Sequence, residues 1–303
     1  MKKEIIALIG WLLLSCQLAA QSSDKFLILD MVHHNPGEPL TKTEFRKSSK
    51  LKEYNYNGMV TNEFKFPQCA LNFDKVDKRI FPKNSKERKW TDELKKEIRE
   101  QIKECHKHGL ESFYFMDIIV LPKKVVELYK DEICDKNGKI SFAKEKTWVI
   151  HKMMLNELFD TFPDMDGLVI RTGETYTHSI PHHMGNGPVD YHNKYAEGLE
   201  THAKLLQLLR EEVCVKRGKK VVYRTWDFGF FHIQPEYYLA VTDQVEPHPN
   251  LYLAIKHTNG DYFRTYPFNK TITLGKHKQV IEVQCQREYE GKGAFTNYVA
   301  NAI

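Results

Sequence analysis

Short apolar runs alternate with longer amphipathic stretches along most of the chain. Seven runs have the length and composition of buried strands, and they lie at 26–31, 58–61, 110–116, 167–172, 220–225, 250–256 and 279–284. Apolar residues at helical spacing predict helices at 91–108, 148–162 and 195–213. The first helix has Thr91 as its expected N-cap and Gly109 as its stop. This alternation favours a parallel sheet with right-handed crossovers.

Polar residues stand at the ends of these apolar runs. They are, in chain order, His33, Asn62, Glu63, Asp117, Arg171, Glu174, Arg224 and Trp226. In a barrel of parallel strands the carboxyl ends meet at one mouth, so these side chains would line one pocket. The pattern therefore predicts an α/β fold of the (β/α)8 TIM-barrel type. A doubly wound open sheet is the competing architecture, but no glycine-rich phosphate loop follows the first run.

The strand count falls one short of a closed eight-stranded barrel. Seven runs are visible, so we expect a barrel that is incomplete at its C-terminus. The chain would then be a truncated version of a longer protein, unless a strand has gone unrecognised at 262–274. An open parallel edge exposes unpaired backbone groups, so truncation predicts marginal stability or aggregation.

The N-terminus has the features of a bacterial export signal. Lys2 and Lys3 precede an apolar run at 5–14 that is too short to span a bilayer. Cleavage after Ala20 would release a protein whose barrel domain covers 24–303, in the periplasm or at the cell surface. The stretch before Cys16 also resembles a lipobox, which would make Cys16 the site of a lipid anchor. Both interpretations stay open.

Composition and charge narrow the class of protein. At 303 residues and 41% hydrophobic content, the chain is long enough for one domain with a large core. Its 45 basic and 40 acidic residues are spread along the sequence, so no nucleic-acid or membrane patch is expected and no later segment is apolar enough to span. The cysteines other than Cys16 show no metal-like spacing, so we expect small buried thiols and no disulfide framework, metal or cofactor.

Three carboxylates follow strand ends and are candidates for catalysis. Glu174 stands on a Gly-Glu turn, Asp261 on an Asn-Gly-Asp turn, and Glu288 in an acidic and aromatic stretch after the last run. An acid and a pair of water-binding carboxylates on opposite sides of a sugar would make a glycoside-hydrolase site. Each also has a structural interpretation: Glu174 could pair with Arg171, and Asp261 could form an Asx turn.

The order of these motifs resembles a known family. The matching elements are Gly173-Glu174, Tyr223-Arg224, Lys256 with Asn259-Gly260-Asp261, and Gln284 followed by Glu288-Tyr289-Glu290-Gly291. Over about 166–298 this pattern is similar to the catalytic barrel of the α-glucuronidases, glycoside hydrolase family 67. The resemblance implies hydrolysis of a terminal sugar from an oligosaccharide or polysaccharide with inversion, Glu174 acting as general acid and Asp261 and Glu288 as bases. Candidate substrate contacts are Arg171, Arg224 and Lys256 for a sugar carboxylate, and Trp226, Tyr176 and Tyr262 for stacking.

Two other classes of function stay open. The chain could be a non-catalytic glycan-binding protein or an inactive, truncated barrel. It could also be a metal-dependent hydrolase of the amidohydrolase type, because His33 and His34 end the first strand. Adjacent residues on a strand point to opposite faces, however, so this pair is poorly placed to share one ion. His182 and His183 are expected to be loop residues or sugar contacts.

Overall fold

A computed structural model describes residues 26–30, 44–63, 65–177, 180–189, 195–263 and 265–284 of the chain. The expected export signal at 1–20, with Cys16, lies outside these ranges, as do His33, His34 and Glu288. Those predictions therefore stay predictions.

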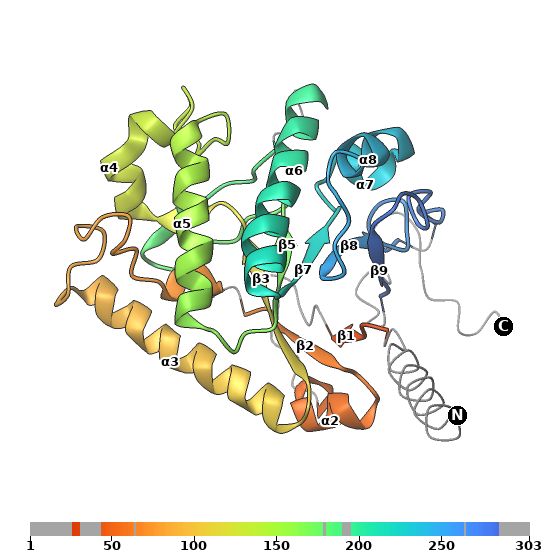
Figure 1. The fold of residues 1–303 in the computed structure, drawn as a ribbon, viewed down its shortest axis with the longest axis horizontal. Coiled ribbons are helices and arrows are strands. Elements are labelled where there is room, and N and C mark those ends of the chain that lie inside the picture. The colour runs from red at the N-terminus through yellow and green to blue at the C-terminus, as the bar shows by residue number, and fades with distance from the viewer. Residues whose placement is uncertain are drawn as a thin grey trace, which may run out of the picture.

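Seven parallel strands form the main sheet (Figure 1), and all seven predicted runs are present in it. The strands are β1 (Leu29–Asp30), β2 (Gly58–Thr61), β3 (Glu111–Asp117), β5 (Gly167–Arg171), β7 (Lys220–Arg224), β8 (Leu251–Lys256) and β9 (Lys278–Glu282). The residues described between 262 and 274 contribute no further strand to the sheet. A separate antiparallel pair joins β4 (Val120–Pro122) to β6 (His183–Gly185).

The strands lie side by side in the order in which they occur along the chain. Right-handed crossovers that always step in the same direction place their helices on one face of the sheet. A doubly wound sheet would reverse its order at a switch point, and this sheet does not. The order therefore identifies an incomplete (β/α)8 barrel, as predicted.

Helices fill the crossovers, and Figure 1 shows α3, α5 and α6 along the same side of the sheet. The helices are α2 (Ser48–Glu53), α3 (Lys86–Lys107), α4 (Lys123–Ile133), α5 (Glu145–Thr161), α6 (Tyr195–Leu209), α7 (Phe230–Ile233) and α8 (Pro235–Thr242). Shorter turns of 3-10 helix lie at Glu44–Arg46 and Pro67–Ala70, and a π-helical turn, Arg210–Val215, continues α6. Within the described ranges, no helix combines the length and the apolar character that a membrane span requires.

The start of α3 corrects one prediction. Thr91 is not its N-cap, because Ser85 stands six positions earlier and its hydroxyl accepts a hydrogen bond from the Arg88 N–H. Thr91 lies inside the helix, where its hydroxyl donates to the Arg88 carbonyl at 2.8 Å. The predicted stop is confirmed: Gly109 follows the C-cap with a φ of +68°, a conformation that favours glycine.

The two faces of the strands belong to different parts of the core. Tyr114, Met116, Leu168 and Ile170 pack with the helices in the largest apolar cluster. The alternate positions form a small cluster of strand residues alone: Val60, Phe113, Phe115, Val169, Val222 and Ala254. A core built only from strand side chains is what the interior of a barrel contains. Four free thiols of the described residues are buried, as expected, at Cys69, Cys105, Cys134 and Cys214.

Candidate active site

A layer of buried polar side chains caps the strand-only core. Each member stands two positions after an apolar residue of the inner face, so the pleat turns it to the same side. The members are Asn62, Asp117, Arg171, Arg224, Lys256 and Glu282, and all are buried. Polar groups at the carboxyl ends of barrel strands are typical of an active site, whereas packing alone would favour apolar residues there.

Asp117 and Arg171 form the first ion pair of this layer. The Arg171 Nε donates to Asp117 Oδ1 at 2.5 Å, and the backbone N–H of Tyr176 donates to Asp117 Oδ2 at 2.8 Å. Burial raises the pKa of Asp117, and the charge of Arg171 only partly opposes this effect. The pair links β3 to β5 and holds the chain that follows β5 against the end of β3. Arg171 thus pairs with Asp117, which the sequence did not indicate.

Arg224 and Glu282 form the second pair, which joins β7 to β9. The guanidinium donates to both carboxylate oxygens, each at 2.7 Å, and the Tyr262 hydroxyl donates to Glu282 Oε2 at 3.2 Å. Burial raises the pKa of Glu282, but the charges of Arg224 and Lys256 and the hydrogen bonds from Arg224 outweigh it and hold that pKa below its usual value. Glu282 was missed as a site residue because it lies inside a predicted strand. Its position on the inner face was the available signal.

The Phe115 ring connects the two pairs. Its centroid lies 5.2 Å from the Arg171 guanidinium carbon and 5.4 Å from that of Arg224. Both distances fall within the range of cation–π attraction. The ring therefore contacts both cations, each of which lies beside its own carboxylate.

Lys256 lies among an acid and two aromatic rings. Its Nζ is 2.6 Å from Asp261 Oδ1, 3.8 Å from the Trp226 ring centroid and 4.8 Å from that of Tyr262. Burial lowers the pKa of Lys256, and the nearby charge of Arg224 lowers it further, while Asp261 opposes both. Asp261 also accepts a hydrogen bond from the N–H of the next residue, Tyr262, at 3.2 Å.

The Trp226 ring packs against the ring of His232, a residue that the sequence analysis did not identify as part of the site. The two rings meet edge to face with centroids 5.0 Å apart. His232 Nδ1 lies 3.0 Å from the Thr225 hydroxyl, and its Nε2 lies 3.2 Å from the Thr258 carbonyl oxygen. Burial lowers the pKa of His232 to about 4, so the ring is neutral at pH 7. It ties the ends of β7 and β8 together beneath the indole.

Glu174 is half-buried and stands near both ion pairs. Gly173 brings its turn close to the chain after β7, since a Cβ at this position would lie 2.6 Å from the Trp226 carbonyl oxygen. The charge of Glu174 contributes to raising the pKa values of Asp117, Tyr176 and Arg224. Glu174 therefore adds a carboxylate beside the polar layer, at the same end of the strands.

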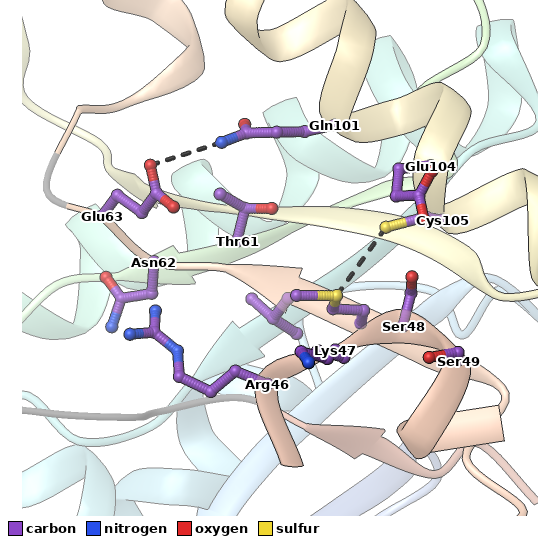
Figure 2. Close-up of a pocket in the computed structure, with 12 residues that line it drawn as sticks. Arg46, Lys47, Ser48, Ser49, Thr61, Asn62, Glu63, Gln101, Glu104 and Cys105 are labelled. Carbon is purple, nitrogen blue, oxygen red and sulfur yellow. Dashed lines mark hydrogen bonds between the residues drawn. The ribbon is translucent and has the colours of Figure 1, made fainter. Parts of the chain in front are cut away.

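Most of the predicted site residues come together in this region. The connected set holds Asp117, Arg171, Glu174, Tyr176, Arg224, Trp226, Lys256, Asp261 and Tyr262. Asn62 and Glu63 also line a separate pocket between β2, α2 and α3 (Figure 2).

The loop histidines are placed differently from each other. His183 lies in β6, and its buried ring packs 5.6 Å from Phe81 and 5.9 Å from Trp90, so it is a core residue and the loop prediction was wrong for it. His182 lies in the turn before β6, with its ring 5.7 Å from Trp90. Within the described part of the chain, no group of three or more metal-binding side chains is arranged to hold an ion.

No protein-family model matches the sequence, and no curated protein matches it. Among solved structures, the chain is similar to a GH138 enzyme targeting pectin rhamnogalacturonan II, at 15% identity and a TM-score of 0.46, covering 76% of this chain and 26% of that one. It is also similar to an O-GlcNAc hydrolase of Thermobaculum terrenum, at 10% identity and a TM-score of 0.40, covering 77% and 41%. A third is a GH5 xyloglucan-specific β-1,4-glucanase from a ruminal metagenomic library, at 11% identity and a TM-score of 0.41, covering 71% and 50%. The chain thus spans about a quarter to a half of the length of these proteins.

Proposed function

We propose that this chain is a glycoside hydrolase that releases a terminal sugar from an oligosaccharide or polysaccharide with inversion, in the manner of an α-glucuronidase. The observation that carries the proposal is the half-buried carboxylate of Glu174 beside the buried layer of Asp117 and Arg224. A carboxyl group at such a strand end can serve as the proton donor to a leaving group. Aromatic side chains at the same strand ends suit the apolar faces of a sugar.

In the proposed reaction, Glu174 in its protonated form donates to the departing glycosidic oxygen. Asp261 accepts a proton from the attacking water on the opposite face of the sugar, and Lys256 holds the Asp261 carboxylate in place. Glu288 is proposed as the second carboxylate that orients this water. An inverting arrangement needs the acid and base about 6.5 to 9.5 Å apart, which leaves room for the water.

The proposed substrate contacts follow from the charges and rings of the layer. Trp226, Tyr262 and Tyr176 would stack on sugar faces, and Lys256 and Arg224 would receive a sugar carboxylate. We also propose that the protein is exported, either released by cleavage after Ala20 or lipid-anchored at Cys16, where extracellular glycans would be its substrates.

Glu174→Gln tests the general-acid role. The variant should lose about 10²- to 10⁴-fold in kcat on an oligosaccharide with a poor leaving group, because the leaving oxygen then goes unprotonated. It should lose far less on a 4-nitrophenyl glycoside, whose leaving group needs no proton. Glu97→Gln, at a surface ion pair with Lys65, is the matched control and should keep both activities. Equal losses on the two substrates would contradict the assignment.

Asp261→Asn tests the base. This variant should lose turnover on both kinds of substrate, since both need the activated water. The anomer formed first, followed by NMR in the unmodified protein, should have inverted configuration. A retained anomer would make a carboxylate the nucleophile, and glycan binding without turnover by the unmodified protein would identify a non-catalytic glycan-binding protein.

A further inference from the structure

A pocket of about 300 Å³ lies where β2 faces α2 and α3 (Figure 2). It shares Asn62 with the buried polar layer but contains none of the connected site residues. Its apolar floor is formed by Met59, Val60 and Cys105. Its polar lining comprises Arg46, Lys47, Ser48, Ser49, Thr61, Asn62, Glu63, Gln101 and Glu104. A volume of this order suits a ligand the size of a single sugar, at the lower end of typical ligand pockets.

Among the charged side chains that line the pocket, Arg46 is the cation available to pair with a ligand. Lys47 is paired with Glu44 at 2.9 Å, and Glu104 is paired with Lys107 and His108. The guanidinium of Arg46 has no carboxylate partner among the residues that the structure describes. The pocket therefore presents a guanidinium whose five N–H groups suit a planar carboxylate.

Asn62 supplies a second polar group that lacks a partner. The residue is 3% exposed, and its Oδ1 is buried without a hydrogen bond in the described part of the chain. Figure 2 shows the Arg46 guanidinium next to the Asn62 amide, while Glu63 points the other way, toward Gln101. Gln101 donates to the Glu63 carboxylate at 3.3 Å, which gives that acid its own contact away from Arg46. A buried polar atom without a partner is costly unless a ligand or water satisfies it.

We propose that this pocket binds a carboxylated sugar. Arg46 pairs with the carboxylate, and the Asn62 amide exchanges hydrogen bonds with a ring hydroxyl beside it. The hydroxyls of Thr61 and Ser48 stand on the same lining and suit further sugar hydroxyls. The choice of a sugar as ligand rests on the proposed function, whereas the choice of an acidic ligand rests on Arg46. The pocket would hold an acidic residue of a glycan outside the catalytic centre.

Binding of three probes to the whole chain tests the proposal. D-glucuronate, D-glucose and acetate are titrated separately, with affinity measured by calorimetry or NMR shifts. D-glucuronate should bind at least tenfold more tightly than either D-glucose or acetate, because only it offers the anion and the hydroxyls together. Arg46→Gln and Asn62→Ala should each weaken this binding about tenfold.

Matched variants separate this pocket from the catalytic centre. Lys50→Gln removes a charge from α2, a helix whose residues Ser48 and Ser49 line the pocket while Lys50 does not, and it should leave D-glucuronate binding unchanged. Because Lys256 is also a proposed contact for a sugar carboxylate at the catalytic centre, the pocket is titrated in a Lys256→Met background. D-glucuronate binding should persist in that background and should not change when Glu174→Gln is added, so loss of turnover and loss of pocket binding are read independently. D-glucuronate binding that is abolished by Lys256→Met but persists in Arg46→Gln would overturn the proposal. So would equal affinity for D-glucose or acetate, or no binding at all.

Discussion

The two buried carboxylate–guanidinium pairs at the strand ends have opposite electrostatic characters. Asp117, between β3 and β5, has a raised pKa because burial dominates and Arg171 is its main cation, with Glu174 adding negative charge nearby. Glu282, between β7 and β9, is as deeply buried but has a lowered pKa, because Arg224 and Lys256 together outweigh its burial. The same pair of functional groups thus has a raised carboxyl pKa on one side of the site and a lowered carboxyl pKa on the other.

The opposite pKa shifts of Asp117 and Glu282 suit a site in which one side supplies an acid and the other a base. A pair of acids whose environments push their pKa values apart is a recurring arrangement in acid–base catalysis. Here Glu174, the proposed acid, adds its negative charge to the surroundings of Asp117, the acid with the raised pKa. The side that stabilises negative charge contains Asp261, the proposed base. The buried pairs are therefore proposed as positioning groups that set the field for the two half-buried carboxylates.

Glu282→Gln should have the largest effect on stability. It leaves the buried Arg224 without its two charge-assisted hydrogen bonds, which should cost about 3 to 5 kcal/mol in the free energy of unfolding. Urea denaturation followed by circular dichroism measures this cost. Glu97→Gln breaks only an exposed pair and should cost at most about 1 kcal/mol. A similarly small cost for both variants would show that the buried Arg224–Glu282 pair stabilises the fold no more than an exposed ion pair does.

Asp117→Asn should cost less, about 1 to 3 kcal/mol in the same measurement. Burial already raises the pKa of Asp117, which lowers the cost of replacing the charge, and the amide oxygen can still accept from the Tyr176 N–H. If Asp117→Asn proves less stable than Glu282→Gln, then the Asp117–Arg171 pair, and not the Arg224–Glu282 pair, contributes more to the free energy of unfolding.

Glu282 and Asp117 should contribute to the pH dependence of stability with opposite slopes. The Glu282 contribution is fully present above its unfolded pKa near 4.5 and is lost as the pH falls through its lower folded value. The Asp117 contribution is fully present below its unfolded pKa near 3.8 and is lost as the pH rises through its higher folded value. Unfolding free energies from pH 3 to 7 should show a flatter acid limb in Glu282→Gln and a smaller decline above pH 4 in Asp117→Asn.

The smallest expected effect concerns the ring above Lys256. A double-mutant cycle of Trp226→Leu with Lys256→Met should give a coupling of about 0.5 to 2 kcal/mol, because the ammonium lies 3.8 Å from the indole centroid and is largely desolvated. The exposed Lys278, 5.8 Å from the Tyr252 ring, offers the comparison cycle and should give about 0.5 kcal/mol or less. Equal couplings would show that burial adds nothing to the contact.

Sequence patterning predicted the strands and most of the polar ends, because the period of two and the length of the apolar runs are local properties. The ion pairs between these strand ends, in contrast, join residues that are far apart in the sequence. Asp117 finds Arg171 54 positions away and Arg224 finds Glu282 58 positions away, so their partnership depends on the register between strands. The pocket of Arg46 and Asn62 was hidden for the same reason, since α2, β2 and α3 form it together. The start of α3 was mistaken because Ser85 and Thr91 offer the same kind of cap, and only the local fold chooses between them.

The order of the strands has a consequence for how the chain assembles. Each sheet contact closes a single crossover, so the sheet can grow by one strand at a time from its N-terminal side as the polypeptide is synthesised. Asp117 meets Arg171 as soon as β5 docks on β3. Arg224, in contrast, is carried into the sheet with β7 and waits through the docking of β8 until β9 brings Glu282. We expect assembly intermediates that lack β9 to have an exposed or hydrated Arg224. Docking of β9, the last described strand, then supplies the carboxylate that neutralises this buried cation.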